Sequence, residues 1–144
     1  MTENSIILRS GREKSVLLKH PWIFASAIEK VIGNPDVGDT VVIRDAKKQF
    51  LGFGAYSPSS QIRARIWSWN PDDIINKDFF YNKISESIQK RNGFKESENT
   101  TALRLIYGEA DGLPGLIVDQ YNESVVVQIL SAGVEKARDD IYSI

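Results

Sequence analysis

The feature of this sequence that most constrains its fold is a run of turn-forming residues between two short apolar segments near its C-terminal end. Asp111-Gly112 and Pro114-Gly115 follow one another with a single leucine between them. Asp-Gly suits a turn with positive φ, and Pro-Gly suits a type II turn. The segment therefore predicts two successive reversals within a hairpin, with positive φ at both glycines.

The same segment carries two acidic residues, Glu109 and Asp111. Two carboxylates at this spacing are candidate Mg²⁺ ligands or an acid–base pair, and they are equally candidate acceptors for turn amides. A metal or hydrolytic site usually needs a third group, and the only histidine, His20, is far away in sequence. We therefore predict a structural turn made by Glu109, Asp111, Gly112, Pro114 and Gly115. On this prediction Asp111 accepts hydrogen bonds from turn amides, and Asp111→Asn costs less stability than Gly112→Ala.

Composition bounds the class of protein. The chain has 144 residues, of which 42% are hydrophobic, so it can form a packed core as one domain or two small ones. It contains no cysteine, which excludes disulfide scaffolds, zinc ribbons and thiol nucleophiles. No apolar run approaches the roughly 20 residues of a membrane span, and the N-terminus lacks a signal-peptide pattern. These observations predict a cytoplasmic protein with no membrane partner and no metal site.

Charge is distributed unevenly along the chain. Residues 1–70 contain ten Lys or Arg and six Asp or Glu residues, whereas residues 71–144 contain eight and thirteen. Segregated charge suggests two units with different partners, and Asn70-Pro71 marks the boundary because a residue before proline disfavours helix. We predict a first domain at residues 1–72 and a second at residues 73–144. The basic half is a candidate for binding a polyanion, with ordinary scatter in charge as the alternative.

The first unit has the pattern of a small β-barrel. Its candidate elements are a short helix at residues 13–18 and strands at residues 5–8, 40–44, 50–56 and 61–69. Strict alternation over residues 61–69 predicts that Ile62 and Ala64 face one side, and that Trp67 and Trp69 face the outer side with Arg63 and Arg65.

The second unit has the pattern of an α/β domain. Asn76 is the predicted N-cap of a helix that ends at Asn92-Gly93 before a polar loop at residues 95–101. The hairpin follows, and then a strand at residues 125–130 whose apolar composition predicts burial on both faces. Ser131 is the predicted cap of a final helix. The predicted fold class is thus α+β, a small β-barrel followed by a small α/β domain with a hairpin and flanking helices.

Basic and aromatic residues cluster in the first unit. The candidates for contact with a nucleic acid are Arg12, Lys14, Lys19, His20, Trp22, Arg63 and Arg65. Lys and Arg neutralise phosphates, an aromatic ring can stack on an unpaired base, and arginines two apart on a strand project from one face. The alternatives are solvated charges and surface salt bridges. For the neighbouring Phe24 we favour a place in the core.

Three blocks of the sequence resemble one protein family. They are Gly11–Phe24 (GREKSVLLKHPWIF), Gly54–Trp67 (GAYSPSSQIRARIW) and Arg104–Tyr121 (RLIYGEADGLPGLIVDQY). In this order they resemble the N-terminal part of bacterial S-adenosylmethionine-dependent 23S rRNA cytosine 5-methyltransferases. The resemblance implies that residues 1–72 are a PUA domain that binds RNA. It also implies that residues 73–144 begin a bridging α/β domain, which is truncated before a catalytic Rossmann-like domain.

The resemblance sets the activity expected of these residues. Enzymes of this family attack the base with a cysteine and take a methyl group from S-adenosylmethionine. The chain has neither a cysteine nor a glycine-rich nucleotide-binding loop, so we expect it to hold no catalytic residue and no cofactor. S-adenosylmethionine is expected in the full-length parent. The expected partner is RNA, 23S rRNA in particular, and not DNA. The alternatives are a protein–protein interaction module without RNA specificity and a stand-alone carboxylate enzyme.

Overall fold

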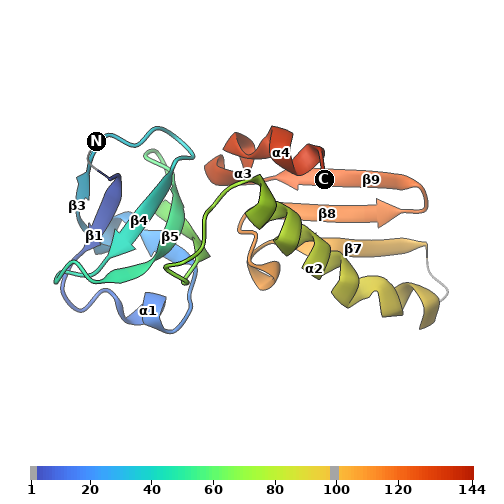
Figure 1. Cartoon of the computed structure of the whole chain (residues 1–144), viewed down its shortest axis with the longest axis horizontal. Coiled ribbons are helices and arrows are strands. Elements are labelled where there is room, and N and C mark those ends of the chain that lie inside the picture. Colours follow the sequence, from blue (N-terminus) through green and yellow to red (C-terminus); the bar gives the residue numbers. More distant parts are fainter. Residues whose placement is uncertain (1–2, 98–100) are drawn as a thin grey trace. The chain divides into compact units, whose positions relative to one another are not determined.

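A computed structural model of the chain describes residues 3–97 and 101–144. The chain divides into two compact units, Met1–Ile75 and Asn76–Ile144, and each is described by itself (Figure 1). Within the described residues, no helix is both long enough and apolar enough to cross a membrane.

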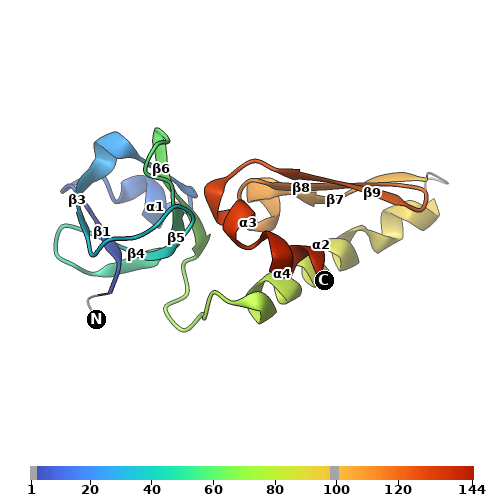
Figure 2. The ribbon, with the colours of Figure 1, turned by 90° about the horizontal axis from the view of Figure 1, so that it is seen from above.

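The first unit is a curled six-stranded sheet with one short helix (Figures 1 and 2). Its elements are β1 (Ser5–Leu8), α1 (Lys14–Leu17), β2 (Trp22–Phe24), a 3₁₀ turn (Ala25–Ala27), β3 (Ile28–Ile32), β4 (Thr40–Arg44), β5 (Phe50–Tyr56) and β6 (Ile62–Ser68). The strand order is β2-β6-β5-β4-β1-β3, and all pairs are antiparallel except the parallel pair β1–β4. The sheet confirms the predicted small β unit and adds two strands, β2 and β3, that the sequence pattern did not reveal.

One apolar core holds the first unit together. Every strand and α1 contribute to it, with Ile6, Leu8, Val16, Ile23, Ile28, Val41, Ile43, Leu51, Ala64 and Ile66 buried. The single turn of α1 is too short to be stable by itself. It is held because Val16, which is 1% exposed, packs into this core.

The prediction that Trp67 and Trp69 lie on the outer face of their strand is wrong. Trp67 is 2% exposed, and Trp69 packs against the core. The register between β5 and β6 shifts between Phe53 and Gly54, which leaves Trp67 as an extra residue in β6. Such a bulge breaks the alternation of side chains. Trp69 lies beyond the last residue of β6, where strand alternation no longer applies.

The second unit begins with the long helix α2 (Lys77–Ser97). Asn76 caps it as predicted, because its side-chain oxygen accepts a hydrogen bond from the Phe79 amide at 3.0 Å. The predicted end at Asn92-Gly93 is wrong. A glycine ends a helix when it takes positive φ, and Gly93 does not, so the helix continues through it. The predicted loop at 95–101 is wrong for residues 95–97, which belong to α2, and residues 98–100 lie outside the described residues.

A three-stranded antiparallel sheet follows α2. It consists of β7 (Ala102–Tyr107), β8 (Leu116–Tyr121) and β9 (Ser124–Ile129), in that order. Helices α2 and α4 (Arg138–Tyr142) lie on one face of it (Figure 2). The prediction that the last strand is buried on both faces is wrong, since Val125 and Val126 are 53% and 49% exposed. The reason is its place at the edge of a sheet that helices cover on one side only.

The predicted final helix consists of two short ones, α3 (Ala132–Lys136) and α4. Ser131 caps α3 as predicted, with its hydroxyl accepting from the Val134 amide at 3.4 Å. Ala137 separates the two helices, and Val134 and Ile141 are buried on the predicted apolar side.

Candidate nucleic-acid interface

The predicted basic residues Arg12, Lys14 and Lys19 lie on and around α1, and all three are exposed. The helix ends in a Schellman motif, in which the His20 amide donates to the Ser15 carbonyl and the Lys19 amide donates to the Val16 carbonyl, both at 2.9 Å. Lys19 takes the left-handed position of this motif, with φ 65°. Its ammonium group lies 5.3 Å from the centre of the Trp69 ring.

The Trp69 ring is held in place by its own hydrogen bond. Its indole N–H donates to the Val16 carbonyl at 3.1 Å, which ties the end of β6 to α1. The cation–π contact with Lys19 is therefore made to a fixed ring. None of Arg12, Lys14 and Lys19 forms an ion pair with another residue in the ranges 3–97 and 101–144. Their charges are thus not neutralised locally, which suits the binding of an anion.

Three aromatic side chains follow one another from just before β2 to its end. The rings of His20 and Trp22 meet edge-on with centroids 5.7 Å apart, and those of Trp22 and Phe24 do so at 6.3 Å. Ile23 between them is buried in the core, so the aromatic rings project from the opposite, outer side. The prediction that Phe24 is a core residue is wrong, because its side chain is 45% exposed. We call His20, Trp22 and Phe24 the aromatic ladder.

The arginines of β6 lie beside this ladder but are not equivalent. Arg65 is the cross-strand partner of Trp22, and both are half-buried. Cross-strand partners project from the same face, so the structure brings these two predicted residues together. Arg63 is the extra residue where the β2–β6 register shifts, and its Nε donates to the Ser60 carbonyl at 3.2 Å. The predicted strict alternation of Arg63 and Arg65 is interrupted there.

The acidic turn in the second unit is organised by an ion pair. Asp111 accepts two hydrogen bonds from the Arg91 guanidinium, at 3.1 and 2.8 Å, and one from the Tyr107 amide at 2.6 Å. The two side chains are 7% and 19% exposed. Burial alone would raise the pKa of Asp111, but these hydrogen bonds outweigh it and hold that pKa below its ordinary value. Ser87 completes the network, accepting from Arg91 at 2.7 Å and donating to the Leu105 carbonyl at 2.8 Å.

The glycines of this turn have the predicted backbone conformation. Gly112 has φ 70° and caps a 3₁₀ turn at Gly108–Asp111, and Gly115 has φ 87°. The Leu116 amide donates to the Leu113 carbonyl at 3.0 Å, so residues 113–116 form the Pro-Gly reversal. The Ser131 hydroxyl donates to the carbonyl of the buried Pro114 at 2.9 Å, which joins the turn to the start of α3. Glu109 is exposed at the outside of the turn.

Comparison with known proteins assigns the first unit. The family model that matches the chain is described as a PUA-like domain, and the match spans residues 6–69, from β1 to the end of β6. The first unit is a PUA-like domain. The predicted nucleic-acid residues all lie within or beside this match.

Relatives extend the similarity to the second unit. The ribosomal RNA large subunit methyltransferase I of Aeromonas hydrophila is 47% identical over 135 residues, which are 94% of this chain and 34% of that protein. The protein of the same name from Pseudoalteromonas translucida is 41% identical over 138 residues, which are 96% of this chain and 35% of that protein. The chain therefore spans about a third of the length of these relatives. The similarity confirms that the three sequence blocks resemble large-subunit rRNA methyltransferases.

Solved structures show the same fold at lower identity. SMU.776, a putative methyltransferase complexed with SAH, matches with a TM-score of 0.81 at 22% identity, over 96% of this chain and 36% of that chain. A putative SAM-dependent methyltransferase from Streptococcus mutans matches with a TM-score of 0.80.

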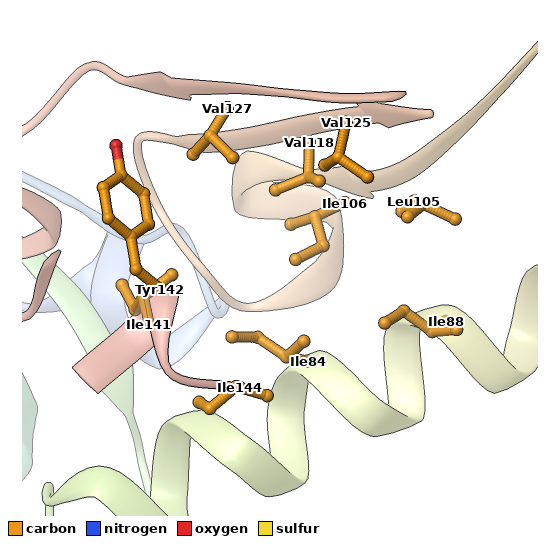
Figure 3. A pocket seen from close by; sticks show the side chains of 10 residues that line it. All are labelled: Ile84, Ile88, Leu105, Ile106, Val118, Val125, Val127, Ile141, Tyr142 and Ile144. Carbon is orange, nitrogen blue, oxygen red and sulfur yellow. The ribbon is translucent and has the colours of Figure 1, made fainter. Parts of the chain in front are cut away.

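Within residues 3–97 and 101–144, no three His, Cys, Asp or Glu side chains gather as metal ligands would. The second unit contains a hollow of about 300 Å³ between α2, the sheet and α4 (Figure 3). Its lining is aliphatic apart from Tyr142, so it offers almost no polar group for binding or proton transfer.

Sequence reasoning missed several residues that organise these sites. It did not single out Arg91 and Ser87, which lie on α2 and meet Asp111 only through folding. It also missed the cross-strand pair Arg104 and Asp119, whose side chains meet at 2.7 Å. Opposite charges on two strands of a predicted hairpin were the available signal for that pair, whereas no local signal pointed to Arg91.

Proposed function

We propose that this chain is the RNA-binding and substrate-positioning portion of a 23S rRNA cytosine 5-methyltransferase that uses S-adenosylmethionine. The observation that carries the proposal is the combination of a PUA-like domain with relatives named as ribosomal RNA large subunit methyltransferases at 41–47% identity. The exposed cations around α1 and the neighbouring aromatic ladder supply the chemistry that RNA binding needs. The proposal implies a cytoplasmic protein, with RNA rather than DNA as its partner.

The methyl-transfer chemistry is assigned to the rest of the longer protein. These 144 residues contain no cysteine to attack the cytosine ring. The SAH named with the similar structure SMU.776 supports S-adenosylmethionine as the methyl donor of the parent protein. The PUA-like domain would hold the RNA, and the second unit would be the start of a domain that bridges to the catalytic part.

The proposal is tested by reversing charge on the proposed surface. Arg12→Glu with Lys14→Glu changes two exposed cations beside α1. Lys47→Glu with Lys48→Glu is the matched control, because it makes the same charge change in the exposed turn between β4 and β5. Affinity for an rRNA fragment is measured by fluorescence anisotropy at several salt concentrations.

We expect the wild-type affinity to fall steeply with salt, because phosphate contacts release counterions. The α1 variant should lose at least about tenfold in affinity and have a shallower salt slope, while the control variant keeps both nearly unchanged. Equal losses in the two variants would show that only net charge matters. RNA affinity that is negligible at low salt would favour the alternative, a protein–protein interaction module.

A further inference from the structure

We propose that the PUA-like domain recognises an unpaired nucleotide through residues 18–24, with the Phe24 ring stacking on the base and the Lys19 ammonium contacting a phosphate. This inference rests on the proposed RNA-binding function and deepens it. It assigns the ligand class, single-stranded rather than duplex RNA, and the two residues that select it.

The aromatic ladder has the geometry of a stacking surface. Neighbouring rings meet edge to face, at 5.7 and 6.3 Å, so at most one face of the terminal Phe24 ring lies against Trp22. Phe24 is 45% exposed at the end of the ladder, although a phenylalanine in a small domain is normally buried. The buried Ile23 fixes the strand, so the Phe24 ring is presented to solvent by a rigid element.

The Lys19 ammonium lies next to this ladder in sequence and is available to an anion. Its contact in the structure is the Trp69 ring at 5.3 Å, an attraction that is weak at an exposed site. A phosphate is a stronger partner for an ammonium than a ring face is. The neighbouring Leu18 is 84% exposed, which adds apolar surface suited to a sugar or base.

These features favour single-stranded over duplex RNA. In a duplex, each base is already stacked between its neighbours, so an aromatic side chain on a strand has no base face to meet.

The left-handed backbone at Lys19 makes a clean test possible. Glycine is preferred in this conformation, so Lys19→Gly removes the ammonium while relieving backbone strain. Lys48 has φ 66° and is also exposed in the same unit. Positive φ is therefore not by itself a mark of function here, and Lys48→Gly is a matched control for both charge and strain.

The experiment measures the binding of a fluorescein-labelled single-stranded oligoribonucleotide of mixed sequence and of the duplex that it forms with its complement. The proteins are the wild-type chain, Lys19→Gly, Lys48→Gly and Phe24→Ala. Val31→Ala is the control for Phe24→Ala, since Val31 is an exposed apolar residue on the other edge strand, β3. Tryptophan fluorescence confirms that each variant is folded.

We expect the wild type to prefer the single strand, and Phe24→Ala to lose about fivefold or more of that affinity. Lys19→Gly should lower the salt slope for the single strand by about 0.7, as expected for one phosphate contact, while both control variants match the wild type. Equal affinity for duplex and single strand, or unchanged single-strand affinity in Phe24→Ala and Lys19→Gly, would overturn the inference but leave the proposed function standing. Failure to bind either RNA would overturn both.

Discussion

Replacing Asp111 by asparagine tests whether the acidic turn is held by its ion pair or by turn amides alone. Asparagine preserves the size of the side chain and an acceptor for the Tyr107 amide, but it removes the charge that faces Arg91. The sequence predicted a small effect, because an amide oxygen can still accept from a backbone N–H. The structure predicts a large one, because it leaves the Arg91 guanidinium, 19% exposed, without its counter-charge.

The expected loss of stability depends on the burial of the Asp111–Arg91 pair and on the hydrogen bonds that Arg91 keeps. Removing one partner of a buried ion pair typically costs about 3–5 kcal/mol. Arg91 would keep its two contacts with Ser87, at 2.7 and 3.0 Å, and part of its hydration. We therefore expect Asp111→Asn to lower the free energy of unfolding of the second unit by about 2–3 kcal/mol. The double variant Arg91→Met with Asp111→Leu should cost less than the sum of its single changes, because it leaves no unpaired charge.

The two units can be followed separately. All three tryptophans lie in the first unit, at positions 22, 67 and 69, so urea unfolding monitored by tryptophan fluorescence reports on that unit. Helical circular dichroism reports mainly on the second unit, which contains α2, α3 and α4. Asp139→Asn is the control, since the Asp139 side chain is 98% exposed, and it should change stability by less than about 0.5 kcal/mol. A cost below about 1 kcal/mol for Asp111→Asn would refute the reasoning from the buried pair.

The pH dependence gives a second measure of the same ion pair. The pKa of Asp111 is held below the ordinary aspartate value of about 3.9, so the stabilisation is fully present above that pH. It is lost as the pH falls through the lower pKa of the folded state. We expect the second unit of the wild type to lose stability below about pH 4, and Asp111→Asn to show a smaller loss over that range. An identical acid dependence in the two proteins would mean that Asp111 is not held as the charged partner of Arg91.

Four further substitutions in the second unit test its turns, its buried hydrogen bond and its helix cap by urea unfolding. Gly112→Ala should lower the free energy of unfolding by about 1 kcal/mol, because Gly112 has positive φ. Gly115→Ala should lower it further, because Gly115 also has positive φ and the added methyl group collides with Ser131. A smaller loss of stability at Gly115 than at Gly112 would contradict this geometry. Ser87→Ala should lower the free energy of unfolding by about 1–2 kcal/mol, since it removes the hydrogen bond that the buried Ser87 hydroxyl donates to the Leu105 carbonyl. A neutral result would mean that water replaces the hydroxyl. Asn76→Ala should cost about 1 kcal/mol by uncapping α2, with Asn76→Asp close to neutral as its control.

Local patterns in the sequence determined the elements and the turn chemistry of this protein. The strands Thr40–Arg44 and Phe50–Tyr56 occur with the bounds that their composition predicted. The cap at Asn76 and the positive φ of Gly112 and Gly115 were likewise predictable. The reason is that strand propensity, capping and turn preference depend on the backbone of a few neighbouring residues, which the sequence specifies directly.

The tertiary structure alone decided which side chains are covered and which ones meet. Phe24 is exposed and Trp67 is buried, the reverse of what the sequence predicted, because strand bulges and sheet edges change which face a residue occupies. Asp111 meets Arg91, 20 positions away, because α2 packs beside β7. Burial depends on what lies over a surface, and an ion pair depends on which elements are brought together. Neither is fixed by the spacing of residues along the chain.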